Sequence, residues 1–240
     1  MTLITTPGSE DELMTRAYNI AGKKVKEVAS VYNLKIPSDN VHAKGWLGIF
    51  FEAVLGANAG NTPTQDFSEL KIELKSIPIA ENLTPSESTY VCIVPLLGSG
   101  TKTFFESNFY NKMSKVLWIP FDGRKNIPIS EKIIFTPFLW SPAGDELSVL
   151  KQDWEEHMEK ISTGYIEDIT ARDGIALQIR PKAANGKILT DAIGKNGQLI
   201  KTRPRGFYLR SSFTKKILQK KFFFDFLKKK CKIKKDYFLF

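Results

Sequence analysis

The spacing of apolar and polar residues predicts helices in the first quarter of the chain. A Ser-Glu-Asp-Glu segment at 9–12 forms a capping box, and a helix is expected from there to about residue 21. Gly22 breaks this pattern, and residues 23–32 are expected to form a second short helix. Residues 46–57 are apolar on nearly every face, which predicts a buried helix that ends at Gly56 or Gly60.

The next part of the chain has the pattern of β-strands. Residues 72–78 alternate between apolar and polar side chains, which is typical of a half-buried strand. An apolar run at 90–94 predicts a central strand, and a second run at 115–119 predicts a strand that Pro120 stops. Consecutive apolar strands of this kind indicate a mixed sheet that is covered on both faces.

The second half of the chain combines one long helix with further strands. Residues 145–163 carry apolar side chains at helical spacing, which predicts a helix ended by Gly164, with Trp154 packed in the core. Residues 175–180 alternate after an Arg-Asp-Gly turn, which predicts one arm of a hairpin. The run 201–210 is basic, with interleaved aromatic residues.

Composition narrows the class of protein. The chain has 240 residues, of which 42% are hydrophobic and 25% charged, as in a globular protein with one large domain or two lobes. No apolar run is long enough to span a membrane, and the N-terminus lacks the pattern of a signal peptide, so we expect a cytoplasmic protein. The two cysteines are far apart, which argues against zinc. The sequence contains only two histidines, which argues against histidine-based nuclease chemistry and leaves carboxylates as the candidate catalytic groups.

The net charge of +9 suggests DNA binding, but its distribution weakens that argument. Residues 215–240 contain ten lysines and two aspartates, which amounts to +8, so the rest of the chain carries only +1. Any contact with DNA by the body of the protein must therefore come from a local cluster of positive charge.

The strand at 72–78 carries the most informative chemistry. Glu73 and Lys75 are two residues apart and therefore point to the same face of a strand. Asp66, just before the strand, can lean over the same position. Two carboxylates and one ammonium in one place would form a Mg²⁺ site beside a cation, which is what phosphodiester hydrolysis requires. The alternative is a chance match on an exposed strand face.

The buried helix contributes a further acid. Glu52 is the only charged residue between Trp46 and Ala57. A buried carboxylate without a partner is costly, so Glu52 requires either a metal or an ion pair with a lysine or arginine.

Ordered blocks of sequence extend from this region toward the C-terminus. They include Lys-Gly-Trp at 44–46, Leu-Gly-Ala at 55–57, Gln-Asp-Phe at 65–67, the run at 178–185 and Pro-Arg-Gly-Phe-Tyr-Leu at 204–209. Read in order over residues 9–222, these blocks resemble the MutH family, the strand-discrimination endonucleases of methyl-directed mismatch repair.

The resemblance implies an α/β fold of the restriction-endonuclease-like type, with a mixed sheet flanked by helices and two lobes around a DNA-binding cleft. The N-terminal catalytic lobe would span about 1–140, and the C-terminal DNA-reading lobe about 141–222. Residues 223–240 have no family counterpart and are expected to be a basic, Phe- and Lys-rich extension with weak order.

The resemblance also implies roles for individual residues. Asp66 and Glu73 would be Mg²⁺ ligands, joined by Glu52 and by the backbone carbonyl of Leu74. Lys75 would be the catalytic lysine. Four side chains would therefore be catalytic: Glu52, Asp66, Glu73 and Lys75.

A second set of residues would contact DNA. Lys44 would approach the DNA backbone and Lys112 the scissile region, although both could be solvated surface lysines. Tyr208 would sense the N6 substituent of adenine, although an ordinary half-buried strand tyrosine is the alternative. The segment that would read a GATC site contains Arg180, Pro181 and Lys182, and an arginine there can pair with guanine.

The function implied is Mg²⁺-dependent nicking of the unmethylated strand of double-stranded DNA at hemimethylated GATC, 5′ to the G. MutL would activate the enzyme after MutS finds the mismatch, and a monomer with one metal site would suit nicking. A GATC-specific restriction endonuclease of the Sau3AI type shares these motifs and is the first alternative. A DNA-binding protein without activity is the second.

Overall fold

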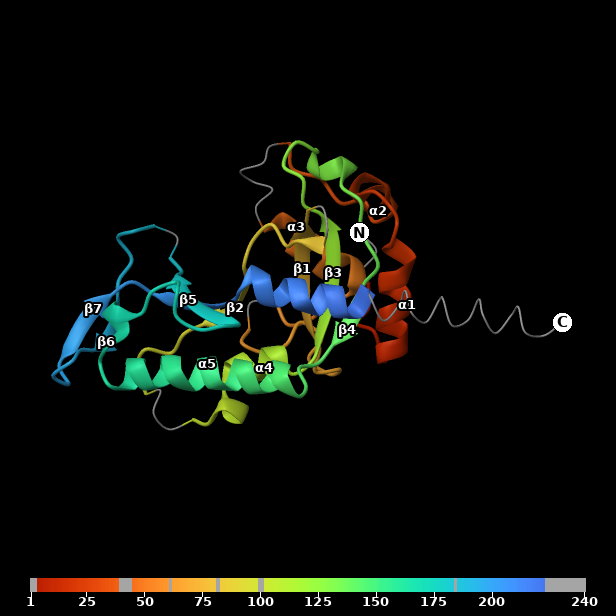
Figure 1. Cartoon of the computed structure of the whole chain (residues 1–240). Coiled ribbons are helices and arrows are strands. Elements are labelled where there is room, and N and C mark those ends of the chain that lie inside the picture. The colour runs from red at the N-terminus through yellow and green to blue at the C-terminus, as the bar shows by residue number, and fades with distance from the viewer. Residues whose placement is uncertain are drawn as a thin grey trace.

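The computed structural model describes residues 4–38, 45–60, 62–80, 83–98, 102–183 and 185–222. Helices surround several small β-sheets, which confirms the expected mixed α/β class (Figure 1). Lys44 and the extension at 223–240 lie outside the described residues, so the predictions for them remain predictions. Among the helices of the described ranges, none is both long and apolar enough to cross a membrane.

The chain begins with three helices, as predicted: α1 (Glu10–Ile20), α2 (Val25–Val31) and α3 (Trp46–Leu55). At the start of α1 the Ser9 hydroxyl accepts the N–H of Glu12 at 3.2 Å. The carboxylate of Glu12 accepts the N–H of Gly8 instead of completing the capping box with Ser9. The predicted cap is therefore confirmed for its serine only.

Helix α3 ends at Gly56, one of the two glycines predicted to stop it. Gly56 has a φ of +81°, and a Cβ there would lie 2.5 Å from the carbonyl oxygen of Thr5. Both the backbone angle and the close approach therefore require glycine. The expectation of a buried helix is confirmed for the side of α3 that carries Phe50, Phe51 and Val54, but the opposite side is open, because Ile49 is 65% exposed.

The first sheet has the strand order β1-β3-β4, from β1 (Glu73–Ile79), β3 (Val116–Asp122) and β4 (Phe138–Trp140). The β1–β3 pair is parallel and the β3–β4 pair antiparallel, so the sheet is mixed, as predicted. Leu74 and Leu117 pack on one face in a hydrophobic cluster with α1, α2 and α3. Ile77 and Trp118 belong to the other cluster, which is formed by residues between Ile77 and Leu218.

The prediction that Pro120 stops its strand was wrong. Strand β4 pairs with β3 only as far as Trp118, so the side of β3 toward β4 has no strand neighbour at Pro120. The Pro120 carbonyl on this side accepts the N–H of Phe135 at 2.8 Å. Residues 133–135 lie on this side instead, through an isolated antiparallel bridge between Phe121 and Ile134. The missing N–H of Pro120 therefore costs no bond to β1, and β3 continues to Asp122.

The second sheet has the order β2-β8-β5 and is antiparallel, from β2 (Thr89–Ile93), β5 (Leu177–Pro181) and β8 (Arg205–Leu209). The prediction of a central strand at 90–94 was wrong, because β2 lies at the edge. Its buried residues are covered by α4 (Asn108–Met113), and burial by a helix gives the same apolar run as burial between strands.

Strand β5 was expected to form a hairpin with a neighbour in sequence. It pairs instead with β8, and the hairpin is formed by β6 (Thr190–Ile193) and β7 (Leu199–Thr202). The long helix α5 (Asp145–Ser162) was predicted correctly and buries Trp154 in the core. Short 3₁₀ helices occupy Phe104–Glu106, Ile129–Glu131 and Ile166–Asp168, and a final helix covers 211–222.

The junction between α5 and β5 is held by a buried acid. The carboxylate of Asp153 on α5 accepts the backbone N–H groups of Ile175, Ala176 and Leu177 at 2.6 to 2.9 Å. These donors immediately precede or begin β5, so a single side chain of α5 fixes the start of the strand that carries Arg180.

Candidate active site

Strand β1 presents Glu73 and Lys75 on the same face, as the alternating pattern predicted. The ammonium of Lys75 lies 2.5 Å from Oε1 of Glu73, and the Glu73 side chain is only 2% exposed. Because the face that carries Glu73 also carries Ile77, the pair projects into the second hydrophobic cluster and not into the cluster of α1 to α3. The Glu-x-Lys pattern is therefore not an exposed strand face.

Lys112 on α4 completes the ion pair. Its ammonium lies 2.9 Å from Oε2 of Glu73 and donates to the carbonyl oxygen of Thr64, also at 2.9 Å. The Lys112 side chain is 12% exposed, so the alternative interpretation as a solvated surface lysine was wrong. Glu73 thus accepts one ammonium on each oxygen, which stabilises a carboxylate that is almost fully buried.

Asp66 is fixed at the outer edge of β1. Its Oδ2 accepts the N–H of Leu74 at 2.8 Å. The N–H and C=O of a strand residue point to the same side, so the Leu74 carbonyl faces this same edge, away from β3. The Asp66 carboxylate and the Leu74 carbonyl, which were predicted to bind the same ion, therefore lie on the same side of β1.

Glu52 of α3 lies within the electrostatic field of this group. Burial raises the pKa of Glu52, and the negative charge of Asp66 raises it further, while Lys75 lowers it. Burial likewise raises the pKa of Asp66, and the Glu73 carboxylate adds to this effect. In the part of the chain that the structure describes, the Glu52 side chain has neither an ion pair nor a hydrogen bond, so the alternative of a lysine or arginine partner finds no support there.

These carboxylates have the chemistry that suits a hard cation. Carboxylate and carbonyl oxygens are the ligands that Mg²⁺ prefers, and the mutual repulsion of Glu52, Asp66 and Glu73 favours a positive ion among them. The described residues nevertheless contain no group of three or more His, Cys, Asp or Glu side chains with the close spacing of a formed metal site. The two lysines neutralise Glu73 in this arrangement, so a cation that binds Glu73 must share or displace their contacts.

A second buried contact supports the loop before Asp66 and was missed by sequence analysis. Gln65 is 6% exposed, and its Nε2 donates to the backbone oxygen of Asn111 at 2.8 Å and to the Asn111 Oδ1 at 2.7 Å. Together with the hydrogen bond from Lys112 to Thr64, this contact holds the loop before Asp66 against α4. Both contacts join segments far apart in sequence, and no local pattern signals them.

The predicted DNA-reading residues meet on one face of the second sheet. Tyr208 on β8 lies directly opposite Tyr90 on β2, with ring centroids 5.3 Å apart. The Arg180 guanidinium lies 5.6 Å from the centre of the Tyr208 ring and donates to the Ser88 hydroxyl at 2.9 Å. The Lys182 ammonium lies 4.5 Å from the centre of the Tyr90 ring. The structure therefore brings Arg180, Lys182 and Tyr208 together, while Pro181 is exposed at the end of β5.

Tyr90 and Gly206 belong to this group and were missed by sequence analysis. Gly206 lies opposite Arg180, and a Cβ there would lie 2.9 Å from the Tyr90 ring and 3.1 Å from the Tyr208 ring. A bare glycine therefore makes room for both rings. Burial raises the pKa of Tyr90 to about 12 and also raises the pKa of Tyr208, so both phenols are uncharged at neutral pH.

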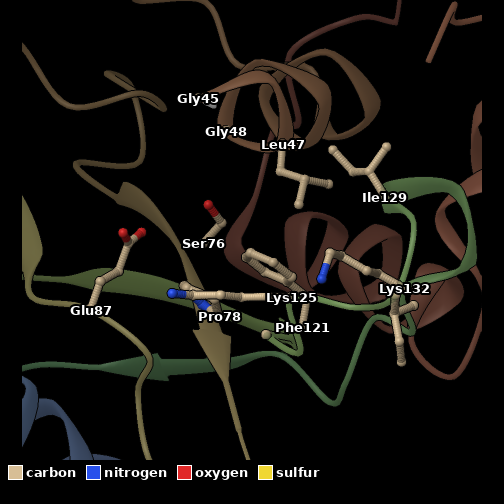
Figure 2. Close-up of a pocket in the computed structure, with 12 residues that line it drawn as sticks. Gly45, Leu47, Gly48, Ser76, Pro78, Glu87, Phe121, Lys125, Ile129 and Lys132 are labelled. Atoms are coloured by element: carbon tan, nitrogen blue, oxygen red, sulfur yellow. The ribbon is translucent and has the colours of Figure 1, made fainter. Parts of the chain in front are cut away.

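A pocket of about 430 Å³ lies beside the candidate site but does not include it (Figure 2). Strand β1 lines this pocket with Ser76 and Pro78, which alternate with the face that carries Glu73 and Lys75. Leu47 at the start of α3 lies across from them in Figure 2. No side chain predicted to be catalytic lines the pocket, so we assign it no part in the chemistry.

Comparison with known proteins decides the family. A family model described as "DNA mismatch repair enzyme MutH" matches residues 55–153, the part of the chain that includes Asp66, Glu73 and Lys75. The DNA mismatch repair protein MutH of Vibrio vulnificus (strain YJ016) is 51% identical over 216 residues, which cover 90% of this chain and 95% of that protein. The chain belongs to the MutH family.

Other MutH proteins match over a similar span. The DNA mismatch repair protein MutH of Vibrio cholerae (strain O395) is 51% identical over 89% of this chain and 97% of that protein. The MutH protein of Serratia proteamaculans (strain 568) is 49% identical over 90% of this chain and 95% of that protein. The similarity therefore extends over both sheets and confirms the family predicted from the sequence blocks.

Proposed function

We propose that this protein is a DNA endonuclease that nicks the unmethylated strand at hemimethylated GATC sites in methyl-directed mismatch repair. The observation that carries the proposal is the cluster of Asp66, Glu73 and Lys75 at one strand of a MutH family chain. Two acids beside a lysine can hold a cation and provide a positive charge, as phosphodiester hydrolysis requires. The names of the relatives support a role in mismatch repair.

Mg²⁺ is the proposed cofactor, with Asp66 and Glu73 as its ligands and with Glu52 and the Leu74 carbonyl as further oxygen donors. When bound, the ion would acidify a water molecule and neutralise charge that develops on the phosphate. Lys75 holds its positive charge against Glu73, where it can orient a water molecule and stabilise an anionic oxygen.

The second sheet would supply sequence recognition. Arg180 has the donor geometry for a guanine edge in the major groove, and Lys182 lies on the same sheet edge. Tyr208 would lie against adenine, where an added methyl group on N6 would collide with the ring or displace it. In this arrangement residues 1–140 form a catalytic lobe and 141–222 a reading lobe around DNA, in a fold of the restriction-endonuclease-like type.

The proposal includes the regulation of the family. MutL would activate a cytoplasmic, monomeric enzyme, and MutS would act upstream by finding the mismatch. One active site per monomer would cut one strand at a time.

Substitution of the acidic cluster tests the catalytic assignment. Asp66→Ala, Glu73→Ala and Lys75→Ala should each reduce Mg²⁺-dependent nicking by at least ~10²-fold, because each removes a preorganised charge. Binding to GATC duplex should persist, since these groups do not face base edges. Glu106→Ala is a matched control, because the Glu106 carboxylate caps Thr103 outside the cluster. Near-normal activity of Lys75→Ala would contradict the assignment.

Substrates that differ in methylation distinguish the proposed nicking enzyme from a GATC-specific restriction endonuclease. Nicking would be measured on unmethylated, hemimethylated and fully methylated GATC duplexes, with and without MutL. We expect single-strand nicks on unmethylated and hemimethylated duplexes, stimulation by MutL and resistance of the fully methylated duplex. Double-strand cutting of unmethylated DNA without any response to MutL would instead indicate a restriction endonuclease of the Sau3AI type.

A further inference from the structure

The loop after β5 and the segment before β8 form one edge of the second sheet. The N–H of Lys182 donates to the carbonyl oxygen of Pro204 at 2.8 Å, and Pro181 pairs with Arg205 in the β5–β8 ladder. A Cβ on Gly186 would lie 3.9 Å from the Arg203 guanidinium, so the loop folds back beside this arginine. Segments about twenty residues apart in sequence therefore lie side by side.

Three exposed cations gather on this edge: Lys182, Lys187 and Arg203. We call these residues the basic edge. The loop that presents Lys187 has a defined turn, because the Lys187 N–H donates to the Asn185 side chain at 3.0 Å. The basic edge lies at the end of the same sheet, since Lys182 follows β5, the strand of Arg180, and Arg203 precedes β8, the strand of Tyr208.

Three carboxylates on or beside the β6–β7 hairpin pair with other cations. Lys201 pairs with Asp191 at 2.8 Å, and Lys195 pairs with Asp168 at 2.8 Å. Arg205 contacts both oxygens of Glu167, which also accepts the Thr202 hydroxyl.

By contrast, Lys182, Lys187 and Arg203 have no ion pair within the described ranges. The basic edge is therefore uncompensated positive charge, although the body of the chain carries almost no net charge.

We propose that Lys187 and Arg203 bind the phosphate backbone of the DNA next to the base-reading residues and set the position of the duplex against Arg180 and Tyr208. This inference rests on the proposed function, because it places the same DNA on the same sheet. Exposed cations without carboxylate partners are the groups that bind phosphates, and such contacts fix register without reading sequence.

Salt-dependent binding tests this assignment. The full chain carrying Lys187→Gln, Arg203→Gln or both would be titrated with GATC duplex and with a duplex lacking GATC, in EDTA so that no cutting occurs. Each phosphate contact contributes a slope of about 0.9 in log K against log[salt]. The double variant should therefore lose about 1.8 from the slope and bind both duplexes more weakly by the same factor.

Lys201→Gln is the matched control, because it removes one positive charge from the hairpin between Lys187 and Arg203, at a residue that is paired with Asp191. Its slope should stay near that of the wild-type protein. An equal loss of slope in Lys201→Gln, an unchanged slope in a double variant that is folded by circular dichroism, or weakening confined to the GATC duplex would each overturn the proposal.

The cleavage assay distinguishes this inference from the proposed function. Nicking of hemimethylated GATC by the wild-type protein tests the acidic cluster, in which Lys187 and Arg203 take no part. A wild-type protein that shows the expected salt slope but cuts no substrate would overturn the proposed function and leave the basic edge supported.

Discussion

At the scale of single residues, the three acids of the candidate site differ in how many partners neutralise them. Glu73 is held by two ammonium groups, Asp66 by one backbone N–H, and Glu52 has no partner within the described part of the chain. The three acids thus range from fully paired to unpaired. Burial and mutual repulsion raise the pKa of Glu52 and Asp66, and a divalent cation would relieve both effects.

Gly206 offers a test of the reading face with a single methyl group. Gly206→Ala should move the rings of Tyr90 and Tyr208, because the new Cβ would lie 2.9 and 3.1 Å from them. We expect a smaller rate difference between unmethylated and fully methylated GATC. Tyr208→Ala, which removes the ring itself, should reduce the difference as well. Nicking rates on the two duplexes provide the measurement.

The control for this substitution is Gly48→Ala, because a Cβ on Gly48 meets no atom within 4 Å. Gly48→Ala should leave methylation discrimination unchanged. If Gly206→Ala and Tyr208→Ala both discriminate as well as the wild-type protein, Tyr208 is an ordinary strand tyrosine and the reading face lies elsewhere.

At the scale of elements, the sequence correctly predicted the features that depend on residues close together in the chain. The Glu73–Lys75 pair follows from strand alternation, and the end of α3 follows from Gly56. By contrast, the partner of β5 and the edge position of β2 depend on pairing between distant segments, which periodicity does not record. Tyr90 was missed for the same reason, because only the register of β2 against β8 brings it to Tyr208.

The junction of α5 and β5 predicts a pH dependence of stability. Burial lowers the pKa of His157, whose Nε2 lies 3.2 Å from the Leu177 carbonyl oxygen. The unfolded chain therefore binds a proton more readily than the folded protein. The stability that a neutral His157 contributes is fully present above about pH 6.5. It is lost as the pH falls through the pKa of His157 in the folded protein.

His157→Gln should remove this loss. The free energy of unfolding of the wild-type protein should fall between about pH 6.5 and 5, and that of the variant should fall less over the same range. Urea titrations at each pH provide the measurement, and most carboxylates titrate below this window in both proteins. Parallel pH profiles for the two proteins would show that His157 does not titrate in this range.

At the scale of the whole molecule, the first sheet separates two hydrophobic clusters. Leu74 and Leu117 face α1, α2 and α3, while Ile77 and Trp118 face the second sheet and α5. Glu73 lies on the face toward the second cluster, and Lys112 reaches it from that side. The acidic cluster is thus built from the first half of the chain, by β1 and α3 on one side and by α4 on the other.

The distribution of charge over the whole chain gives the last prediction. Residues 215–240 carry +8 of the net +9, and 223–240 lie beyond every residue assigned to catalysis or base reading. If 223–240 contact phosphates, their deletion should weaken binding to all duplexes alike and reduce the salt slope by about 0.9 per lost contact. Nicking at saturating DNA and the preference for GATC should survive. A truncated protein that is folded by circular dichroism yet cannot nick saturating GATC duplex would show that the extension belongs to the catalytic unit.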